Sequence, residues 1–569
     1  MEESKDLERR GPDTDLIEIS KNYFENMINM CDERKALILD EDTLGYISLN
    51  YSRSNLLEKN VYFFDVIDRK GTEKLNHLVA IFFVRNTNDN FQKIKEELED
   101  PLFGAYYLVF ANPIEDEKLR ELAEADRFDK VRRVLEIFAD FYAVNRDLFS
   151  FNIPTSMDLC LHESAMTPAT HVKNNRILQG LLSVVLSCRK QPYVRFSKHS
   201  NRAAKLADSF VSYMSSEDEL VARSSKDDEK CTLLILDRKD DPVTPLLNQW
   251  TYQSMVHELI GITKHRVKLA DKKEEIVLNP DEDEFFKKNM YKKFPEVQKE
   301  LEVLLTQFKE KEKSRAKIDN IKDMQRMVEN FPEFKKFAGK VTKHYSAFGE
   351  CSDKITKRKL FSVCELEQDI AVKNSKSEQV KEMKEILEDP EVDQFEKIRL
   401  VMLFSLRYEG DSNVKKFRTM LRESNISPDH IDFIDFLIQY AGKDKRSNFL
   451  FGKNTGLLKG AMDLIKSNFT EEDESVYTRH KSCLFNIIGQ MVKGKLSESD
   501  FPFSTQSPRD TKTKDIIVFI LGGATYQEAK EVADFNNSDP NFNVILGGTT
   551  VHNSKSFLAE VTEVRDYGL

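Results

Sequence analysis

The sequence predicts a mixed α/β and α fold, with two parallel-sheet α/β domains, the second split by a mainly helical inserted domain. Short apolar runs alternate with amphipathic segments at both ends of the 569-residue chain, as in sheets covered by helices. The middle is rich in Lys, Glu, Phe and Met at helical spacing and shows few strand signals. The last two strands cannot bury both their faces alone, so they need a sheet elsewhere in the chain. We therefore expect domain one at 1–145, domain two at 146–260 and 496–569, and the insertion at 261–495.

Domain one is predicted to alternate strands and helices. Several of its apolar runs are too uniform for a sheet with one wet face, which indicates strands covered on both sides. Such runs predict strands at 36–40, 46–50, 61–67, 78–84 and 105–111. Apolar residues at helical spacing predict helices at 15–33, 90–99, 115–124 and 129–144.

The rest of the chain follows the same reasoning. In the first half of domain two, we expect strands at 193–196 and 231–237 and helices at 176–188, 203–214 and 248–260. In the insertion, helical spacing predicts helices at 297–311, 318–330, 334–356, 377–387 and 394–408. At the end, DIIVFILGG and NVILGG predict strands at 515–523 and 543–548, with helices at 525–535 and 554–561.

Composition narrows the class of function. The chain carries 86 basic and 97 acidic residues, a net charge of −11, which argues against general nucleic-acid binding. The N-terminus is polar, and no run approaches the roughly 20 apolar residues of a membrane-spanning helix. We therefore expect a cytoplasmic protein that meets membranes only through partners. Seven scattered cysteines without a C-x-x-C pair predict reduced thiols, no metal site and no cofactor.

Glycine pairs follow both C-terminal strands, where nucleotide enzymes bind phosphate. Neither pair forms G-x-G-x-x-G or G-x-x-x-x-G-K-[ST], and glycine also simply permits a sharp turn. The motifs G-x-S-x-G and H-E-x-x-H and the EF-hand loop do not occur in the sequence. We expect no enzyme; the alternative is an α/β enzyme with a nucleotide or sugar phosphate at 522–525 and 547–550.

The most distinctive stretch is LLILDRKDDPVTPLLNQWTYQSMVHELIGI, at 233–262. A predicted strand delivers Asp237 and Arg238 at its C-terminal end, and Asp241, Pro242 and Pro245 then fix a turn. Strand ends are where α/β folds place binding sites, so one interpretation is catalytic. We favour the other, a buried Asp–Arg arrangement that holds a tight turn at a domain corner, because buried charges need partners.

This stretch resembles the hallmark segment of the SM (Sec-one/Munc-eighteen) family of syntaxin-binding proteins. Other segments are similar to the same family: LILDEDT at 37–43, LAEAD at 122–126, YAVNRDLFSFNI at 142–153, FFKKNMYKKFPEV at 285–297 and the two C-terminal strands. LNQWTYQSMVHELIGI and GGTTVHNSKSF are most similar to its endosomal and trans-Golgi branch. The resemblance implies a three-domain arch. It also implies a monomeric regulator that binds a syntaxin, chaperones SNARE assembly and is recruited peripherally to Golgi and endosomal membranes.

The resemblance also implies a pocket for the N-terminal peptide of syntaxin, on the outside of domain one. Its residues are Leu119, Leu122, Val131, Val134, Leu135 and Phe138. The last four fall at i, i+3, i+4 and i+7, which makes one apolar stripe on the helix predicted at 129–144. Such a stripe is also typical of ordinary core, and that alternative stays open.

Two further surfaces are implied by the resemblance. A charged cleft for the syntaxin body would use Asp40, Asp65 and Arg69, which could equally be solvated surface charges. A hairpin that templates SNARE pairing would use Phe334, Phe337 and Val341, for which the alternative is an ordinary helix with a core face. A scaffold of another tethering complex is a second alternative for the whole chain.

Overall fold

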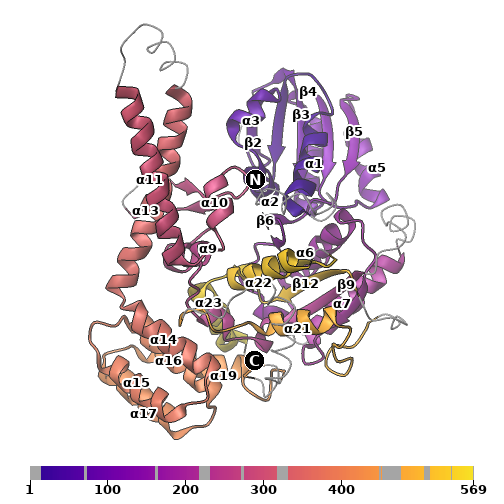
Figure 1. The fold of residues 1–569 in the computed structure, drawn as a ribbon. Coiled ribbons are helices and arrows are strands. Elements are labelled where there is room, and N and C mark those ends of the chain that lie inside the picture. Colours follow the sequence, from indigo (N-terminus) through magenta and orange to yellow (C-terminus); the bar gives the residue numbers. More distant parts are fainter. Residues whose placement is uncertain are drawn as a thin grey trace. The chain divides into compact units, whose positions relative to one another are not determined.

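The computed structural model, drawn as a ribbon in Figure 1, divides into two compact units. Unit 1 comprises Met1–Arg238, Ile487–Ala524 and Val532–Val551, and unit 2 comprises Lys239–Asn486, Thr525–Glu531 and His552–Leu569. The residues that the structure describes are 15–69, 73–160, 165–216, 231–270, 275–316, 331–447, 450–451, 476–504, 513–539 and 541–567. Side chains are described throughout these ranges except at 311–316, 331–334 and 564–567. The helix predicted at 318–330 lies outside the described residues.

Unit 1 contains a five-stranded parallel sheet in the order β2-β1-β3-β4-β5. Its strands are β1 (Lys35–Leu39), β2 (Val61–Val66), β3 (Leu75–Val84), β4 (Phe103–Phe110) and β5 (Val131–Glu136). The accompanying helices are α1 (Leu16–Ile28), α2 (Glu41–Asn50), α3 (Arg53–Glu58), α4 (Asn88–Glu99) and α5 (Asp116–Ala125). Phe24 of α1 contacts Phe83 on one face, with ring centroids 5.6 Å apart, and Phe91 of α4 stacks on Phe110 of the other. Both faces are therefore covered, as the uniformly apolar strands predict.

The strand predicted at 46–50 is wrong, because these residues belong to helix α2. Asp40 is the N-cap of this helix: its carboxylate accepts a hydrogen bond from the Thr43 backbone N–H at 2.8 Å. In return the Thr43 hydroxyl accepts from the Asp40 N–H at 3.0 Å. This reciprocal capping box fixes the start of the helix, a signal that the apolar pattern alone does not carry.

The helix predicted at 129–144 is also wrong. The chain there forms the edge strand β5 and then β6 (Tyr142–Asn145). The register between β4 and β5 skips Arg132, which makes this residue a bulge in the strand. The bulge brings Val131 and Val134 to the same face of the sheet although they lie three positions apart. Their spacing therefore imitates a helical period.

The second sheet of unit 1 has six strands in the order β6-β7-β14-β12-β9-β8. The strands besides β6 are β7 (Leu148–Ser150), β8 (Tyr193–Phe196), β9 (Cys231–Asp237), β12 (Asp515–Leu521) and β14 (Asn543–Gly548). Strand β12 pairs in parallel with β9, and β14 pairs in parallel with β7. This sheet is thus built from segments on both sides of the helical insertion, as the sequence predicts.

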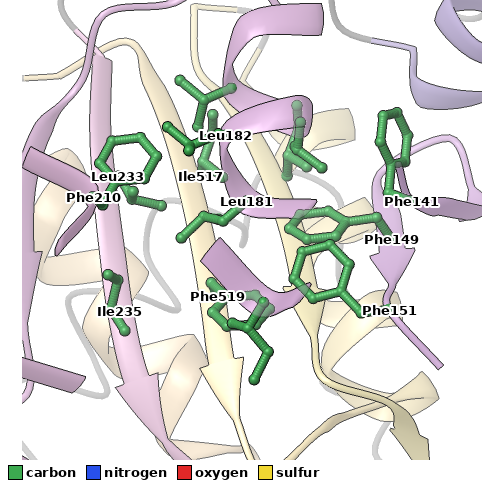
Figure 2. Packing of buried hydrophobic residues seen from close by; sticks show 14 of the residues in the cluster. Phe141, Phe149, Phe151, Leu181, Leu182, Phe210, Leu233, Ile235, Ile517 and Phe519 are labelled. Atoms are coloured by element: carbon green, nitrogen blue, oxygen red, sulfur yellow. The ribbon is translucent and has the colours of Figure 1, made fainter. Parts of the chain in front are cut away.

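The core of the second sheet is rich in aromatic rings. Figure 2 shows Phe149 and Phe151 beside Phe519 of the central strand β12; Phe149 stacks on Phe519 with centroids 6.1 Å apart. Leu181, from helix α6 (Pro168–Ser187), belongs to the same buried cluster (Figure 2). Helix α7 (Asn201–Ser216) lies in unit 1, and α21 (Cys483–Val492) and α22 (Tyr526–Ser538) lie partly in it.

Unit 2 is mainly helical, with one short hairpin of β10 (Arg266–Val267) and β11 (Ile276–Val277). Its shorter helices are α9 (Tyr252–Leu259), α10 (Glu284–Asn289), α14 (Leu360–Val372), α15 (Lys376–Glu388), α16 (Gln394–Arg407), α17 (Ser412–Glu423), α18 (Pro428–Ile431), α19 (Phe433–Ala441) and α23 (Ser554–Tyr567). Its two longest helices, α11 (Phe294–Ala316) and α13 (Phe331–Lys357), lie side by side (Figure 1).

The predicted fold class is confirmed: the chain forms two sheets accompanied by helices, the second sheet is built from two separate segments, and the insertion is mainly helical. The domain boundaries at 145, 260 and 495 stay predictions. Among the described helices, none combines the length and the apolar character that a membrane crossing requires. The described residues also contain no group of three or more side chains suited to hold a metal ion.

Candidate functional site

The first candidate surface lies where α5 covers the edge strand β5. Leu122 of α5 is 2% exposed and belongs to the core of the first sheet, and Val131 and Val134 are half-buried against the same core. Leu119, one turn earlier on α5, exposes 40% of its surface. We call these four residues the outer seam. Leu122, Val131 and Val134 pack in one core between helix and strand, and Leu119 is the accessible residue on the same helix face.

The other two residues predicted for the pocket do not join the outer seam. Leu135 pairs with Val109 across the sheet, one position after Val134, so it points to the opposite face. Phe138 lies in a bend beyond the end of β5 and is half-buried. The helical stripe that grouped these residues in the sequence is therefore not formed, because strand geometry separates them.

A neighbouring exposed aromatic residue escaped the sequence reasoning. Phe128 lies in the connection between α5 and β5 and exposes 57% of its surface. The Asp126 carboxylate shapes this connection, since it accepts hydrogen bonds from the backbone N–H groups of Lys130 and Val131, both at 2.8 Å. The only signal in the sequence was a phenylalanine within the charged run ADRFDK.

The three residues predicted for the charged cleft have different environments. Besides capping α2, the buried Asp40 carboxylate accepts from the Arg85 N–H at 2.7 Å and from Asn90 Nδ2 at 2.8 Å. Burial raises the pKa of Asp40, although the hydrogen bonds to its carboxylate act to lower it. Arg69 forms an ion pair with Glu97 at 2.7 Å. Asp65 is half-buried, and its carboxylate accepts a hydrogen bond from the backbone N–H of Val66. Its carboxylate is therefore more accessible than that of Asp40.

Apolar side chains, in contrast, are exposed along the same edge of the sheet. Tyr62 and Phe64 of β2 expose 57% and 36% of their surfaces, and Leu57 of the preceding α3 exposes 55%. The register between β1 and β2 skips Tyr62, so this residue lies in a bulge of the edge strand. The sequence predicted a strand at 61–67, and the structure adds that its apolar side chains form a partly open edge beside Asp65.

The third candidate surface is the helix pair α11 and α13. Phe294 stacks on Phe348 with ring centroids 4.1 Å apart, and Phe308 contacts Phe337 at 6.2 Å, so the two helices run antiparallel. Val341 is 7% exposed and Phe337 is half-buried. The side chain of Phe334 lies outside the described residues. In this conformation, Val341 therefore belongs to the core of unit 2, and Phe337 is engaged with α11.

A series of buried polar contacts connects α13 to neighbouring elements of unit 2. His344 is 0% exposed; its Nδ1 lies 3.0 Å from the Tyr252 hydroxyl, and its Nε2 lies 2.8 Å from Asp283 Oδ2. Burial lowers the pKa of His344, although the neighbouring Asp283 carboxylate opposes this shift. These contacts connect α13 to α9 and to the N-cap of α10. The helix ends at Lys357, and the chain turns through Lys359, which has φ of +52°, before α14 begins.

The distinctive strand end is held by charges, but not through the neighbouring pair that the sequence suggested. Asp237, 3% exposed, forms a two-pronged ion pair with Arg202, whose Nε and Nη2 lie 2.8 and 2.7 Å from its oxygens. Arg238 points elsewhere and donates from Nε to the Gly523 carbonyl at 3.0 Å. Both side chains are thus engaged in fixing strand ends of the second sheet.

The turn that follows lies in unit 2 and depends on Asp241. Its carboxylate accepts from the Thr244 N–H at 3.0 Å, the Thr244 hydroxyl at 2.7 Å and the Cys483 N–H at 2.9 Å. Pro242 and Pro245 flank these acceptor contacts, and Pro245 lies in a short 3-10 turn at Thr244–Leu246. The buried carboxylate is therefore fully engaged in holding the turn.

The glycine pairs have packing reasons. Gly522 and Gly523 adopt φ of +88° and +87°, which favours glycine. A Cβ atom on Gly547 would lie 2.0 Å from Phe149 Cζ, and one on Gly548 would lie 2.5 Å from the Ala524 nitrogen. Close packing and turn geometry thus account for all four glycines.

Comparison with known proteins places these surfaces in context. A model of the Sec1 family matches residues 35–560. Vacuolar protein sorting-associated protein 45 of Homo sapiens is 38% identical to this chain over 557 residues, which cover 95% of each protein. The Saccharomyces cerevisiae protein of the same name is 30% identical and aligned over 93% of this chain and 94% of its own. The solved structure "SM Protein Vps45 in Complex with Qa SNARE Tlg2 (1-310)" superposes with a TM-score of 0.87 at 36% identity, covering 97% of this chain and 98% of that one.

Proposed function

The chain belongs to the Sec1 family of SM proteins, and from this membership we propose that it binds a syntaxin-type SNARE of the endosome or trans-Golgi network and chaperones SNARE assembly in vesicle transport. One observation carries the proposal: the fold matches, over 97% of the chain, that of a Vps45 solved together with a Qa SNARE. The function would reside in surfaces that hold a helical client. It would need no chemical step.

We propose the outer seam as the site for an N-terminal peptide of the SNARE. A short peptide needs an accessible apolar anchor next to a firm support, and Leu119 and the buried Leu122 provide these two features on one helix face. The exposed ring of Phe128 would extend the same apolar surface. Val131 and Val134 would contribute from β5.

We propose that the SNARE body contacts the open edge of the first sheet through Tyr62, Phe64 and Asp65. Asp40 and Arg69 would act indirectly, because their side chains hold α2 and the edge of the sheet in place. Templating at Phe337 and Val341 would require α11 and α13 to move apart, since their apolar faces are engaged with one another here.

An α/β enzyme is the weaker candidate. All four glycines at the predicted phosphate positions have a packing or turn role, which removes the feature that suggested this activity. We propose a cytoplasmic, non-enzymatic protein recruited to Golgi or endosomal membranes by its SNARE. A thermal-shift screen tests the alternative, because a bound nucleotide or sugar phosphate would raise the melting temperature of the chain.

Pull-down of the full chain with the cytosolic parts of a panel of syntaxins tests the proposed function. We expect retention by one or very few Qa SNAREs. If no syntaxin retains the chain, or if all of them retain it equally, a scaffold of another tethering complex or an unrelated role would be favoured.

The matched variants Leu119→Arg and Val172→Arg test the outer seam. Both replace an exposed apolar residue of unit 1 with arginine; Val172, on α6, exposes 67% of its surface. We expect Leu119→Arg to abolish capture of the N-terminal peptide, because a charge in an apolar contact loses burial and must be desolvated. Val172→Arg should leave capture unchanged. Undiminished capture by a well-folded Leu119→Arg chain would remove Leu119 from the site.

A further inference from the structure

Helices of unit 2 meet around one buried guanidinium group, that of Arg399 on α16. Arg399 Nη2 contacts Glu367 of α14, and Nη1 lies 3.0 Å from Glu396 Oε2, one turn away on α16. Nη1 also lies 3.5 Å from Glu258 Oε1 of α9. Arg399, Glu367 and Glu396 are 0% exposed, and Glu258 is 6% exposed. We call these four residues the Arg399 cluster.

The Arg399 cluster has more carboxylates than nearby cations. Three carboxylates face Arg399, and the second cation in reach is Arg358, whose Nη1 lies 3.6 Å from Glu396 Oε1. Asp393, at the start of α16, adds a further negative charge. Cys364 of α14 also faces the cluster, and burial raises the pKa of its thiol, so it supplies no charge at neutral pH. Full ionisation would therefore leave at least one excess negative charge without access to water.

The three carboxylates are not equivalent. Glu367 accepts hydrogen bonds from the Asn248 backbone N–H at 3.0 Å and from Asn248 Nδ2 at 3.1 Å. Glu258 accepts from the N–H of Ser554, at the start of α23, at 2.9 Å and also from its hydroxyl. Glu396 has arginine contacts, but neither of its oxygens accepts a well-aligned hydrogen bond from the described residues. Glu396 therefore gains least from ionisation.

We propose that the Arg399 cluster holds one proton in the folded protein below neutral pH, centred on Glu396 and shared with Glu367, so that the helical unit loses stability as the pH rises towards neutrality. Burial raises the pKa of both groups, that of Glu367 to about 7. Because the groups are close and coupled, the proton belongs to the cluster as a whole.

The direction of the pH dependence follows from linkage. In the unfolded chain, a glutamate titrates near pH 4.3. Between about pH 4.5 and 7, the folded unit therefore binds one proton more than the unfolded chain, and the unfolding constant rises about tenfold per pH unit. Above this window the stabilisation is lost, and below it both states are protonated.

The only tryptophan gives a local readout. Trp250 lies in unit 2, is 3% exposed and stacks against Tyr477 with ring centroids 4.8 Å apart. Urea unfolding of the full chain, followed by Trp250 fluorescence from pH 5.5 to 8.5, therefore reports on this unit. We compare the wild type with Glu396→Gln, which mimics the protonated side chain, and with Glu385→Gln on α15, where the side chain is 65% exposed.

Between pH 5.5 and 7, we expect the unfolding constant to rise with pH less steeply in Glu396→Gln than in the wild type. The difference in slope should be up to tenfold per pH unit. Glu385→Gln should follow the wild type. Parallel profiles for Glu396→Gln and wild type would overturn the proposal.

A spectroscopic measurement covers the case in which Glu396→Gln does not fold. Infrared absorption separates protonated from ionised carboxyl groups. Glu531 is another buried group of unit 2, and burial raises its pKa to about 7, so the measurement uses the Glu531→Gln chain. A protonated-carboxyl band at pH 6 that disappears by pH 8.5 supports the proposal, and its absence at pH 6 overturns it.

Discussion

Truncation of Leu119 to alanine is the sharpest test of the outer seam, because its effect on binding can be separated from its effect on folding. Leu119 leaves 40% of its surface exposed. Complete burial of a leucine side chain yields about 1.5–3 kcal/mol, so covering the exposed part with a peptide is worth about 1 kcal/mol. Leu119→Ala should therefore weaken peptide binding about fivefold. It should change the free energy of unfolding by less than about 0.5 kcal/mol, as for other surface positions.

Two neighbouring truncations give the opposite results. Leu122 is already 2% exposed without any partner, so Leu122→Ala should destabilise unit 1 by about 2–5 kcal/mol. Leu135 points to the other face of β5, so Leu135→Ala should leave the Kd of the peptide unchanged. Had the stretch been a helix, Leu135 and Val134 would have shared one stripe and both would matter.

Fluorescence anisotropy provides the measurement, with a labelled peptide that copies the N-terminus of the SNARE retained by the full chain. Urea unfolding of each variant supplies the stability control. The reasoning is refuted if Leu119→Ala binds the peptide as tightly as the wild type does. It is also refuted if Leu135→Ala weakens binding as much as Leu119→Ala, because the contact would then not lie on the α5 face.

Two further predictions concern stability. Gly547→Ala places a Cβ atom 2.0 Å from the fully buried Phe149 ring, so we expect the free energy of unfolding to fall by about 1–3 kcal/mol. The measurement is a lower urea midpoint at unchanged slope. An unchanged midpoint would show that the ring moves aside without cost. Burial alone would raise the pKa of Asp283, but hydrogen bonds and charge from His344 and Lys343 outweigh burial and lower this pKa. This carboxylate therefore stabilises unit 2 above about pH 4, and the contribution is lost as the pH falls further. Asp283→Asn should be less stable at pH 7 and lose less stability on acidification; acid profiles parallel to wild type would contradict this.

The fold was predictable wherever a pattern of apolar residues decides the structure. The uninterrupted run at 515–521 could only be a strand covered on both faces, and its need for a host sheet predicted the split domain. The pattern failed where a polar contact or an irregularity decides. At Asp40, a capping box begins a helix that the apolar residues at 46–50 do not reveal. At Arg132, a bulge gives a strand the spacing of a helix.

The candidate site was predictable in part, because side-chain accessibility depends on tertiary packing. The sequence and the family resemblance selected Leu119, and the structure leaves it accessible. They also selected Asp40, whose carboxylate is engaged by three neighbouring groups. The partner of Asp237 was equally hidden, since Arg202 lies 35 positions earlier in the chain and no local spacing connects them. Such pairings appear only once the sheet has assembled.

The two sheets of unit 1 are joined by more than the chain connection between β5 and β6. Leu16 and Ile19, at the start of α1, are buried in the core of the second sheet, whereas Phe24 of the same helix contacts the first. Near the other end of the first sheet, Asp140 follows β5 and is bound by Arg176 of α6, with Nη1 at 3.1 Å from its carboxylate. Removing the second sheet would therefore expose the apolar start of α1 and take Arg176 away from Asp140. The chain passes from the first sheet to the second between β5 and β6, and the shared helix and ion pair join the two sheets, so a peptide held at the outer seam would be held by the whole of unit 1.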